Sequence, residues 1–178
     1  MADGIGSATV AVFSAVCLGY LTQFVAEDFR RFRDGSALAA GLSGELSSYK
    51  PALPILRDTL RSWIGLVAGG RRTELHLRPF DRPVDVVFDH AVGKLGLLGS
   101  ATVESVVFVY SNLRAFRMAL EMVTTKGVEM SDEELRLRCE GCLQALERAA
   151  ERAESLVPEL QARAVKSFRP GWCWLRRP

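Results

Sequence analysis

The apolar positions of this chain form one uncharged run followed by long series of residues spaced three or four positions apart. Such a series, called a seam below, lies on one face of a helix. Residues 5–25, IGSATVAVFSAVCLGYLTQFV, contain no charged side chain, whereas the rest of the chain is polar or amphipathic. An α-helix rises about 1.5 Å per residue, so this run would measure ~30 Å, about the thickness of the hydrocarbon core of a bilayer. We therefore expect an N-terminal transmembrane helix that tethers the remainder of the chain.

Three other interpretations compete with a membrane anchor. A cleaved signal peptide needs a basic segment before its apolar run, and the only charged side chain there is that of Asp3. A buried helix of a soluble domain seldom stays uncharged over this length. A helix that lies on a membrane surface would show a polar face, and residues 5–25 have none. The anchor fits the composition best.

Basic residues determine the orientation that we expect. None precedes the apolar run, whereas Arg30, Arg31 and Arg33 follow it closely. The positive-inside rule therefore places the C-terminal body in the cytoplasm, and we expect a single-pass protein of the bacterial inner membrane. The reverse topology would place the body outside the cytoplasm.

Apolar residues after the anchor are separated alternately by three and four positions, the spacing of helices that pack against helices. Between residues 46 and 67 this seam keeps its register across Pro51 and Pro54. Each proline removes a backbone hydrogen bond, so we expect either one kinked helix or two nearly collinear helices. A break at residues 34–36 should precede this segment, with Ser36 as the N-cap of the first body helix.

Two later segments show the same spacing. Residues 102–125 form the most apolar part of the body, and apolar residues on several sides of this helix predict that it is the central one. The last helix should run from Ser131 to about Phe168, with Glu134 completing a capping box. The seam of residues 102–125 is Val106, Val109, Leu113, Phe116, Leu120 and Val123. The seam of the last helix is Leu135, Cys139, Cys142, Leu146, Ala149, Ala153, Leu156 and Leu160.

These patterns predict an all-α protein, with an N-terminal transmembrane helix followed by an antiparallel helical bundle of long helices. We divide the chain into an anchor with its juxtamembrane segment (1–33), a helical bundle domain (34–168) and an aromatic-basic tail (169–178). Three long helices that alternate in direction would place this tail at the end of the bundle remote from the membrane.

The connection between the first two long helices contains a short predicted helix, residues 84–94, and a tight apolar turn. Residues 88–110, FDHAVGKLGLLGSATVESVVFVY, resemble a block found in many uncharacterised bacterial proteins of this size. Those proteins tend to have one N-terminal membrane helix and a helical body. The asparagine typical of that block, near His90 or Ala91, is absent here. The resemblance implies a small membrane-tethered helical protein and no particular activity.

The net charge and the absence of known motifs argue against several classes of function. With a net charge of only +2, the chain lacks the strong positive charge typical of proteins that bind nucleic acid. Four cysteines at scattered positions do not form a disulfide framework, which is typical of a reducing compartment. The sequence contains no phosphate-binding loop, nucleophile elbow or zinc-protease motif. We therefore expect no cofactor, no metal and no small-molecule ligand.

Cys139 and Cys142 form a single C-x-x-C, which can act as a redox pair or as half of a zinc site. Both occupy seam positions of a predicted helix, and no predicted strand precedes that helix. We therefore interpret them as core residues.

His90 has no second histidine or cysteine nearby in the sequence, so we interpret it as a packed or surface residue. Glu104 lies on the most apolar helix, where we expect an ion pair with Arg114 or Lys94. With no catalytic constellation among these residues, we predict that the protein is not an enzyme.

The tail combines aromatic and basic residues, which suits a membrane interface, a contact with a partner protein, or packing onto the bundle. The expected partner contacts are Trp172, Trp174, Leu175, Arg176 and Arg177. We thus expect a membrane-tethered, non-enzymatic helical interaction or scaffold protein that binds another protein or a second copy of itself. If the topology were reversed, an extracytoplasmic sensor or an envelope or phage-lysis component would fit instead.

Overall fold

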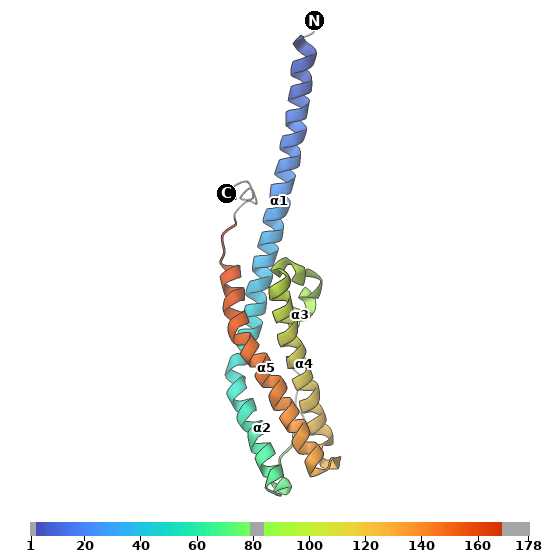
Figure 1. The fold of residues 1–178 in the computed structure, drawn as a ribbon, viewed down its shortest axis with the longest axis vertical. Coiled ribbons are helices and arrows are strands. Elements are labelled where there is room, and N and C mark those ends of the chain that lie inside the picture. The colour runs from blue at the N-terminus through green and yellow to red at the C-terminus, as the bar shows by residue number, and fades with distance from the viewer. Residues whose placement is uncertain (1–2, 79–83, 169–178) are drawn as a thin grey trace.

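The computed structural model describes residues 3–78 and 84–168, except for the side chains of residues 3–12 and Cys17. Within this range the chain is helical without strands, which confirms the all-α prediction. The α-helices are α1 (Asp3–Tyr49), α2 (Leu53–Ala68), α3 (Val86–Ala91), α4 (Ser100–Lys126) and α5 (Asp132–Ala164). The 3-10 segments are η1 (Lys50–Ala52), η2 (Arg72–Glu74), η3 (Val92–Leu98) and η4 (Gly127–Glu129). Figure 1 shows an elongated bundle from which the N-terminal half of α1 projects.

The helix α5 packs against α1, α2 and α4, and thereby holds the bundle together. The prediction that residues 102–125 form the central helix is therefore wrong. α4 buries one apolar face against α5 and the corner formed by α3 and η3, whereas Val107, Phe108, Met118 and Met122 on its other sides are exposed. Apolar residues on several sides of α4 thus do not mean burial on several sides.

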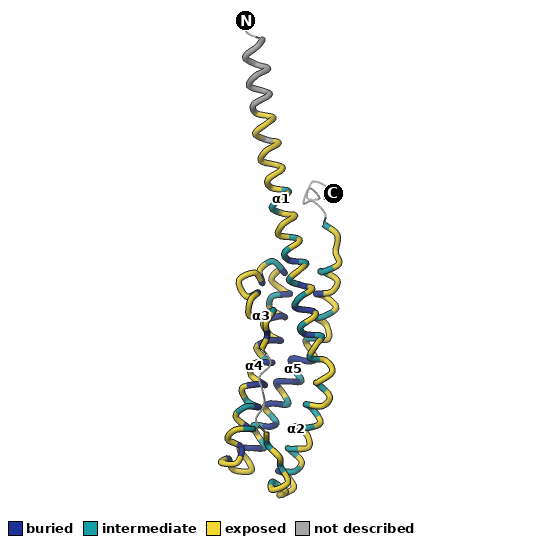
Figure 2. The backbone as a smooth tube through the Cα atoms, turned by 180° about the vertical axis from the view of Figure 1, so that it is seen from behind, coloured by how far each residue is buried: buried dark blue, intermediate teal, exposed yellow. Residues whose placement is uncertain are grey.

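The core has two parts along the length of the bundle. In the first, α1, α3, η3, α4 and α5 surround Tyr110 and Leu160. In the second, α2, α4 and α5 surround Leu60 and Leu146. Figure 2 shows these buried positions as a line between the helices. The three predicted seams supply most of these residues, which confirms the prediction of a helical bundle.

The helix α1 continues without interruption through Gly35 and Ser36, where the sequence predicted a break and an N-cap. That prediction was wrong because Gly35 serves a close approach of other elements. A Cβ atom at Gly35 would lie 3.2 Å from the carbonyl oxygen of Leu97 in η3 and 3.4 Å from Nη2 of Arg163 in α5. The glycine permits three elements to meet there, and α1 tolerates its low helix propensity.

The two prolines separate α1 from α2 by a single 3-10 turn. Pro51 lies in η1 and Pro54 in the first turn of α2, where a proline costs little because that backbone N–H has no partner within the helix. Tyr49 and Ala52 keep helical dihedral angles, with φ near −80° and ψ near −20°. The chain therefore continues down the same side of the bundle as two consecutive helices (Figure 1).

The connection from α2 to α4 returns along the whole bundle. It brings Asp85 within hydrogen-bonding distance of Tyr49 at the end of α1. The carbonyl of Leu97 in η3 then lies beside Gly35, near the point where α1 enters the bundle, so α4 starts at that end (Figure 1). α4 then descends and α5 ascends, which places Phe168 against Phe29 and Phe32 of α1. The expectation that the tail begins at the remote end of the bundle is therefore wrong, because it assumed that the second long helix runs opposite to the first, whereas the long connection lets α4 run in the same direction as α1 and α2 (Figure 1).

Ser131 caps α5 as predicted, since its hydroxyl accepts a hydrogen bond from the backbone N–H of Glu134 at 3.2 Å. The Glu134 carboxylate does not reach back to complete a capping box but pairs with Arg138, one turn later, at 2.7 Å. The start of α5 is thus stabilised by a cap and by acidic residues near the positive end of the helix dipole.

We predict that alanine will act differently at two glycines of α1. Alanine favours a helix over glycine by about 0.5–1 kcal/mol. At Gly44 nothing lies within 4 Å of an added Cβ, so this gain should be realised, whereas at Gly35 the Leu97 carbonyl has to move. Thermal unfolding followed by circular dichroism should show a higher midpoint for Gly44→Ala and no rise for Gly35→Ala. An equal rise in both variants would contradict the close approach of η3 to α1.

Candidate functional site

Cys139 and Cys142 lie in the second part of the core, where α5 meets α2 and α4. Both thiols are free and buried. Burial raises the pKa of Cys139 to about 11 and that of Cys142 to about 12. Near neutral pH neither is a thiolate, the form that attacks disulfides or binds zinc. Their environment supports the interpretation as core residues.

His90 and Glu104 are both exposed. Nδ1 of His90 lies 2.8 Å from the carbonyl oxygen of Val86 on the same helix. Arg114, one of the two expected partners of Glu104, instead forms an ion pair with Asp89 of α3, so the expected pair of Glu104 with Arg114 was wrong. Among the residues that the structure describes, no three His, Cys, Asp or Glu side chains are arranged to hold a metal ion.

A buried polar network joins α1, α3 and α4, and no sequence motif predicted it. Arg117 of α4 donates two hydrogen bonds to the carboxylate of Asp85, at 2.6 and 2.8 Å. The two side chains are only 9% and 3% exposed. The hydroxyl of Tyr49 donates to Oδ1 of the same carboxylate at 2.9 Å. Such a paired, fully hydrogen-bonded charge is the form in which charges are tolerated in a core.

Glu45 of α1 forms the second half of this network. Its carboxylate accepts hydrogen bonds from the backbone N–H groups of Val87 and Phe88, at 2.8 and 3.1 Å, and from the hydroxyl of Tyr110 at 2.7 Å. The first backbone N–H groups of any helix have no acceptor within the helix. In α3 the carboxylate of Glu45, from another helix, accepts these hydrogen bonds. Glu45 thereby fixes the start of α3 against α1, and Phe88 stacks on Tyr110 with ring centroids 4.0 Å apart.

The hydrogen-bond donors of this network hold their protons more tightly than usual. Burial and the hydrogen bond to Asp85 raise the pKa of Tyr49 to about 12. Burial and Glu45 also raise the pKa of Tyr110. Burial opposes the charge of Arg117, but the hydrogen bonds and charge of Asp85 outweigh it and raise the pKa of Arg117. Tyr49, Tyr110 and Arg117 therefore keep their protons near neutral pH, and we assign the network a structural role: it holds the corner of α3 and η3 on the bundle.

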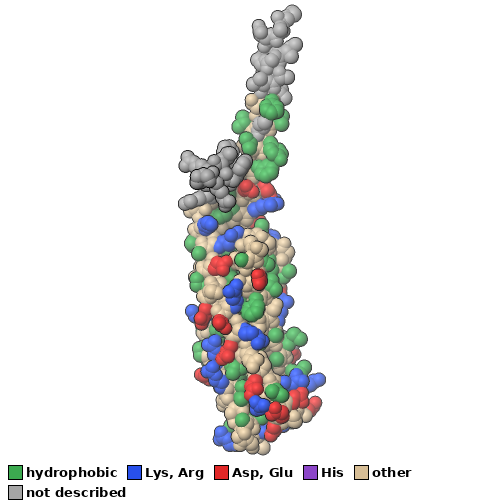
Figure 3. Space-filling view, in the orientation of Figure 1, with side chains coloured by type: hydrophobic (Ala, Val, Ile, Leu, Met, Phe, Trp, Pro, Cys, Tyr) green, Lys and Arg blue, Asp and Glu red, His purple; other side chains and the backbone are tan. Residues whose placement is uncertain are grey.

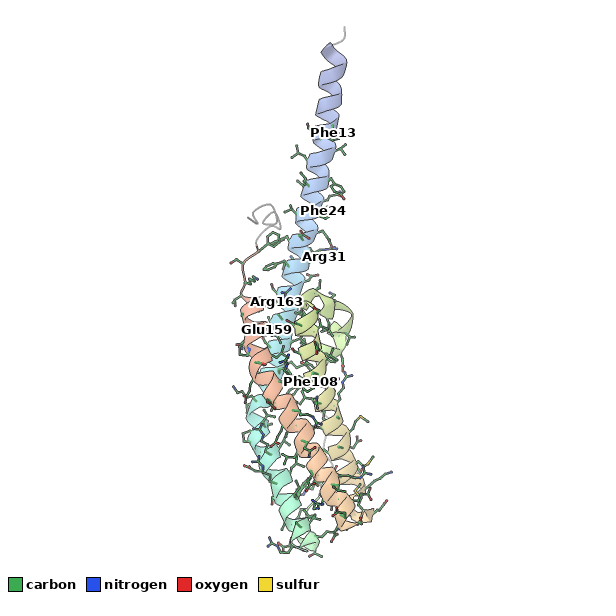
Figure 4. All side chains as sticks on the ribbon, viewed as in Figure 1. Phe13, Phe24, Arg31, Phe108, Glu159 and Arg163 are labelled. Atoms are coloured by element: carbon green, nitrogen blue, oxygen red, sulfur yellow. The ribbon has the colours of Figure 1, made fainter. Side chains whose placement is uncertain are left out.

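The projecting segment comprises residues 3–25 of α1. It extends roughly 35 Å beyond the bundle at helical rise. Among its described side chains, six large apolar ones are exposed, from 44% at Leu21 to 72% at Phe13. The described members of this set are Phe13, Val16, Leu18, Tyr20, Leu21 and Phe24. Figure 3 shows hydrophobic side chains along the projecting helix, and Figure 4 labels Phe13 and Phe24 there, away from the bundle. Soluble monomers rarely leave contiguous apolar surface uncovered, so this segment is a candidate interaction site.

Charged and aromatic residues of α1, from Glu27 to Arg33, separate the projecting segment from the bundle. We call residues 27–33, together with Phe168, the collar. Glu27 pairs with Arg30 at 2.8 Å and with Arg31 at 3.0 Å. Hydrogen bonds from Arg31 and then Arg30 hold the pKa of the Glu27 carboxyl below its usual range. Between Glu27 and Arg30, the ring of Phe29 meets that of Phe168 edge-on, with centroids 5.2 Å apart. Charged and aromatic residues are thus interleaved on α1 directly after the apolar segment.

Within the described residues, no helix is both long and apolar enough to cross a membrane. The predicted anchor, residues 5–25, lies only partly within that range, since the side chains of residues 5–12 and Cys17 fall outside it. The tail residues expected to contact a partner are also outside the described residues: Trp172, Trp174, Leu175, Arg176 and Arg177.

Comparison with known proteins finds no matching family, no similar curated protein and no similar solved structure.

We predict that Asp85→Asn will destabilise the bundle far more than Asp89→Asn. Both residues pair with an arginine of α4, but Asp85 and Arg117 are buried whereas Asp89 and Arg114 are about half exposed. Removing one partner of a buried pair typically costs about 3–5 kcal/mol, against less than about 1 kcal/mol for an exposed pair. Urea unfolding measures both values. Equal losses would show that the buried network does not hold the corner in place.

We also predict that Cys139 and Cys142 resist alkylation in the folded protein. Their raised pKa values and burial leave almost no accessible thiolate at pH 8. In a chain with Cys17→Ser and Cys173→Ser, iodoacetamide followed by mass spectrometry should detect no modification until denaturant is added. Rapid labelling of the folded chain would revive the redox interpretation.

Proposed function

We propose that this protein is a membrane-tethered, non-enzymatic helical interaction or scaffold protein. The observation that carries the proposal is the exposed apolar surface of the projecting segment. Transfer of one such side chain out of water contributes about 1.5–3 kcal/mol, so six of them supply on the order of 10 kcal/mol. The same uncharged run continues in the sequence to Ile5, which extends the apolar length toward that of a bilayer core.

The collar supports this assignment and an orientation. Arg30, Arg31 and Arg33 lie on the bundle side of the apolar segment, and no basic residue precedes it. By the positive-inside rule the bundle faces the cytoplasm, as in a single-pass protein of the bacterial inner membrane. Aromatic rings such as Phe29 sit beside these arginines, where rings favour the membrane–water boundary.

The bundle is the part that would act on other proteins. Its buried polar network is closed and its cysteines are protonated core residues, so these groups support a structural role. The chain leaves α5 beside the collar, because Phe168 contacts α1 there. The contacts expected of Trp172 and Trp174 would therefore be made close to the membrane surface, with a partner protein or with lipid headgroups.

Arginine substitution in the projecting segment tests the tether. Val16→Arg with Leu21→Arg should release the full chain from membranes, because each arginine at the centre of a membrane helix costs roughly 3 kcal/mol. The readout is the fraction of protein that resists carbonate extraction. Val128→Arg is the matched control, since Val128 is 86% exposed but lies in η4, far along the bundle. A wild-type chain that is fully extracted by carbonate would contradict the tether.

Protease protection of a C-terminal tag in spheroplasts tests the orientation. A cytoplasmic bundle keeps the tag intact until lysis. Immediate digestion would reverse the topology, and the sensor or envelope role would then replace the cytoplasmic scaffold.

A further inference from the structure

α4 carries a second seam on the face opposite its buried one. The buried seam packs into the core, whereas this outer seam alternates steps of four and three residues as far as Met122 and then takes a second step of four to Lys126. Its members are Glu104, Phe108, Ser111, Ala115, Met118, Met122 and Lys126. All seven are exposed, including Phe108 at 43% and Met118 at 63%. Phe108 is labelled on α4 in Figure 4.

The residues of the outer seam would match those of a second copy of α4 that runs in the opposite direction. If two copies of α4 lie antiparallel with Ala115 on the two-fold axis, Glu104 of each chain faces Lys126 of the other. Phe108 faces Met122 by the same symmetry, which brings an aromatic ring against a thioether. The small Ala115 lets the two helices approach closely at the axis. A parallel pair would instead bring Glu104 against Glu104 and Lys126 against Lys126.

We propose that the outer seam of α4 is the interface of an antiparallel homodimer. The occupant is a second copy because the acidic end and the basic end of the seam match each other across a two-fold axis. Such isologous interfaces are the commonest way in which soluble domains pair. The dimer is independent of how the projecting segment is used, since the seam lies entirely on α4.

The antiparallel arrangement has a consequence that rests on the proposed membrane tether. α1 and α4 both run along the long axis of the molecule (Figure 1). Reversing the second copy therefore directs the two projecting segments away from each other. Paired chains insert into two facing membranes rather than side by side in one flat bilayer, so the dimer would hold two membrane surfaces together.

Disulfide trapping tests the interface in the full chain, with Cys17→Ser and Cys173→Ser as background. Ala115→Cys, on the two-fold axis, should cross-link under mild oxidation in detergent to a band of twice the monomer mass. Ser62→Cys, an exposed position on α2, is the control and should cross-link at least about tenfold more slowly. Equal rates at the two positions would overturn the proposal.

A charge swap tests the direction of pairing. Glu104→Lys or Lys126→Glu alone converts two attractive contacts into two repulsive ones and should weaken the dimer about tenfold. The double variant restores both contacts and should restore cross-linking through Ala115→Cys. Failure of the double variant to recover would exclude the antiparallel pair. Both side chains are exposed, so circular dichroism should be unchanged in all variants.

Reconstituted vesicles separate this proposal from the membrane tether. Wild-type protein in phosphatidylethanolamine–phosphatidylglycerol vesicles should cluster them, measured by dynamic light scattering, and Glu104→Lys should abolish clustering. Protein that floats with vesicles without clustering them would refute the bridging consequence and leave the tether intact. Protein that cross-links in detergent but does not float with vesicles would refute the tether and leave the dimer intact.

Discussion

The buried ion pair between Asp85 and Arg117, with Glu45 beside it, fixes the point at which the chain turns back into the bundle. A charge pair of this kind contributes little net stability, because desolvation offsets most of the attraction, but it tolerates only one arrangement of its donors and acceptors. The network therefore specifies where α3 lies against α1 and where α4 begins. Every later element takes its position from that corner.

Because α4 starts where α1 enters, α5 ends there as well. The geometry brings Phe168 to Phe29 and places the collar between the apolar projecting segment and the bundle. One end of the molecule thus combines apolar, charged and aromatic surface, whereas the remote end carries the η4 turn between α4 and α5 and the start of the connection that follows α2. This polarity along the long axis gives the proposed tether its physical basis.

The outer face of α4 illustrates how an apolar pattern can have two meanings. Both of its faces have the spacing of helix packing, but α5 and the α3–η3 corner cover only one of them. The apolar residues of the second face are either exposed to water, which is unfavourable, or covered by another chain. Glu104 and Lys126 lie near the ends of α4 where the helix dipole favours them, and across the proposed two-fold axis these opposite charges would also face each other.

The sequence by itself determined the helices, because heptad spacing and caps such as Ser131 act locally. It also predicted that Cys139 and Cys142 are core residues, from their place on a seam. Only the tertiary structure decided that Gly35 permits a close contact instead of ending a helix, since the carbonyl of Leu97 comes from a distant segment. The same holds for the Asp85–Arg117 pair and for the path of the connection to α4. Partners far apart in the sequence leave no local pattern, so only the folded chain reveals them.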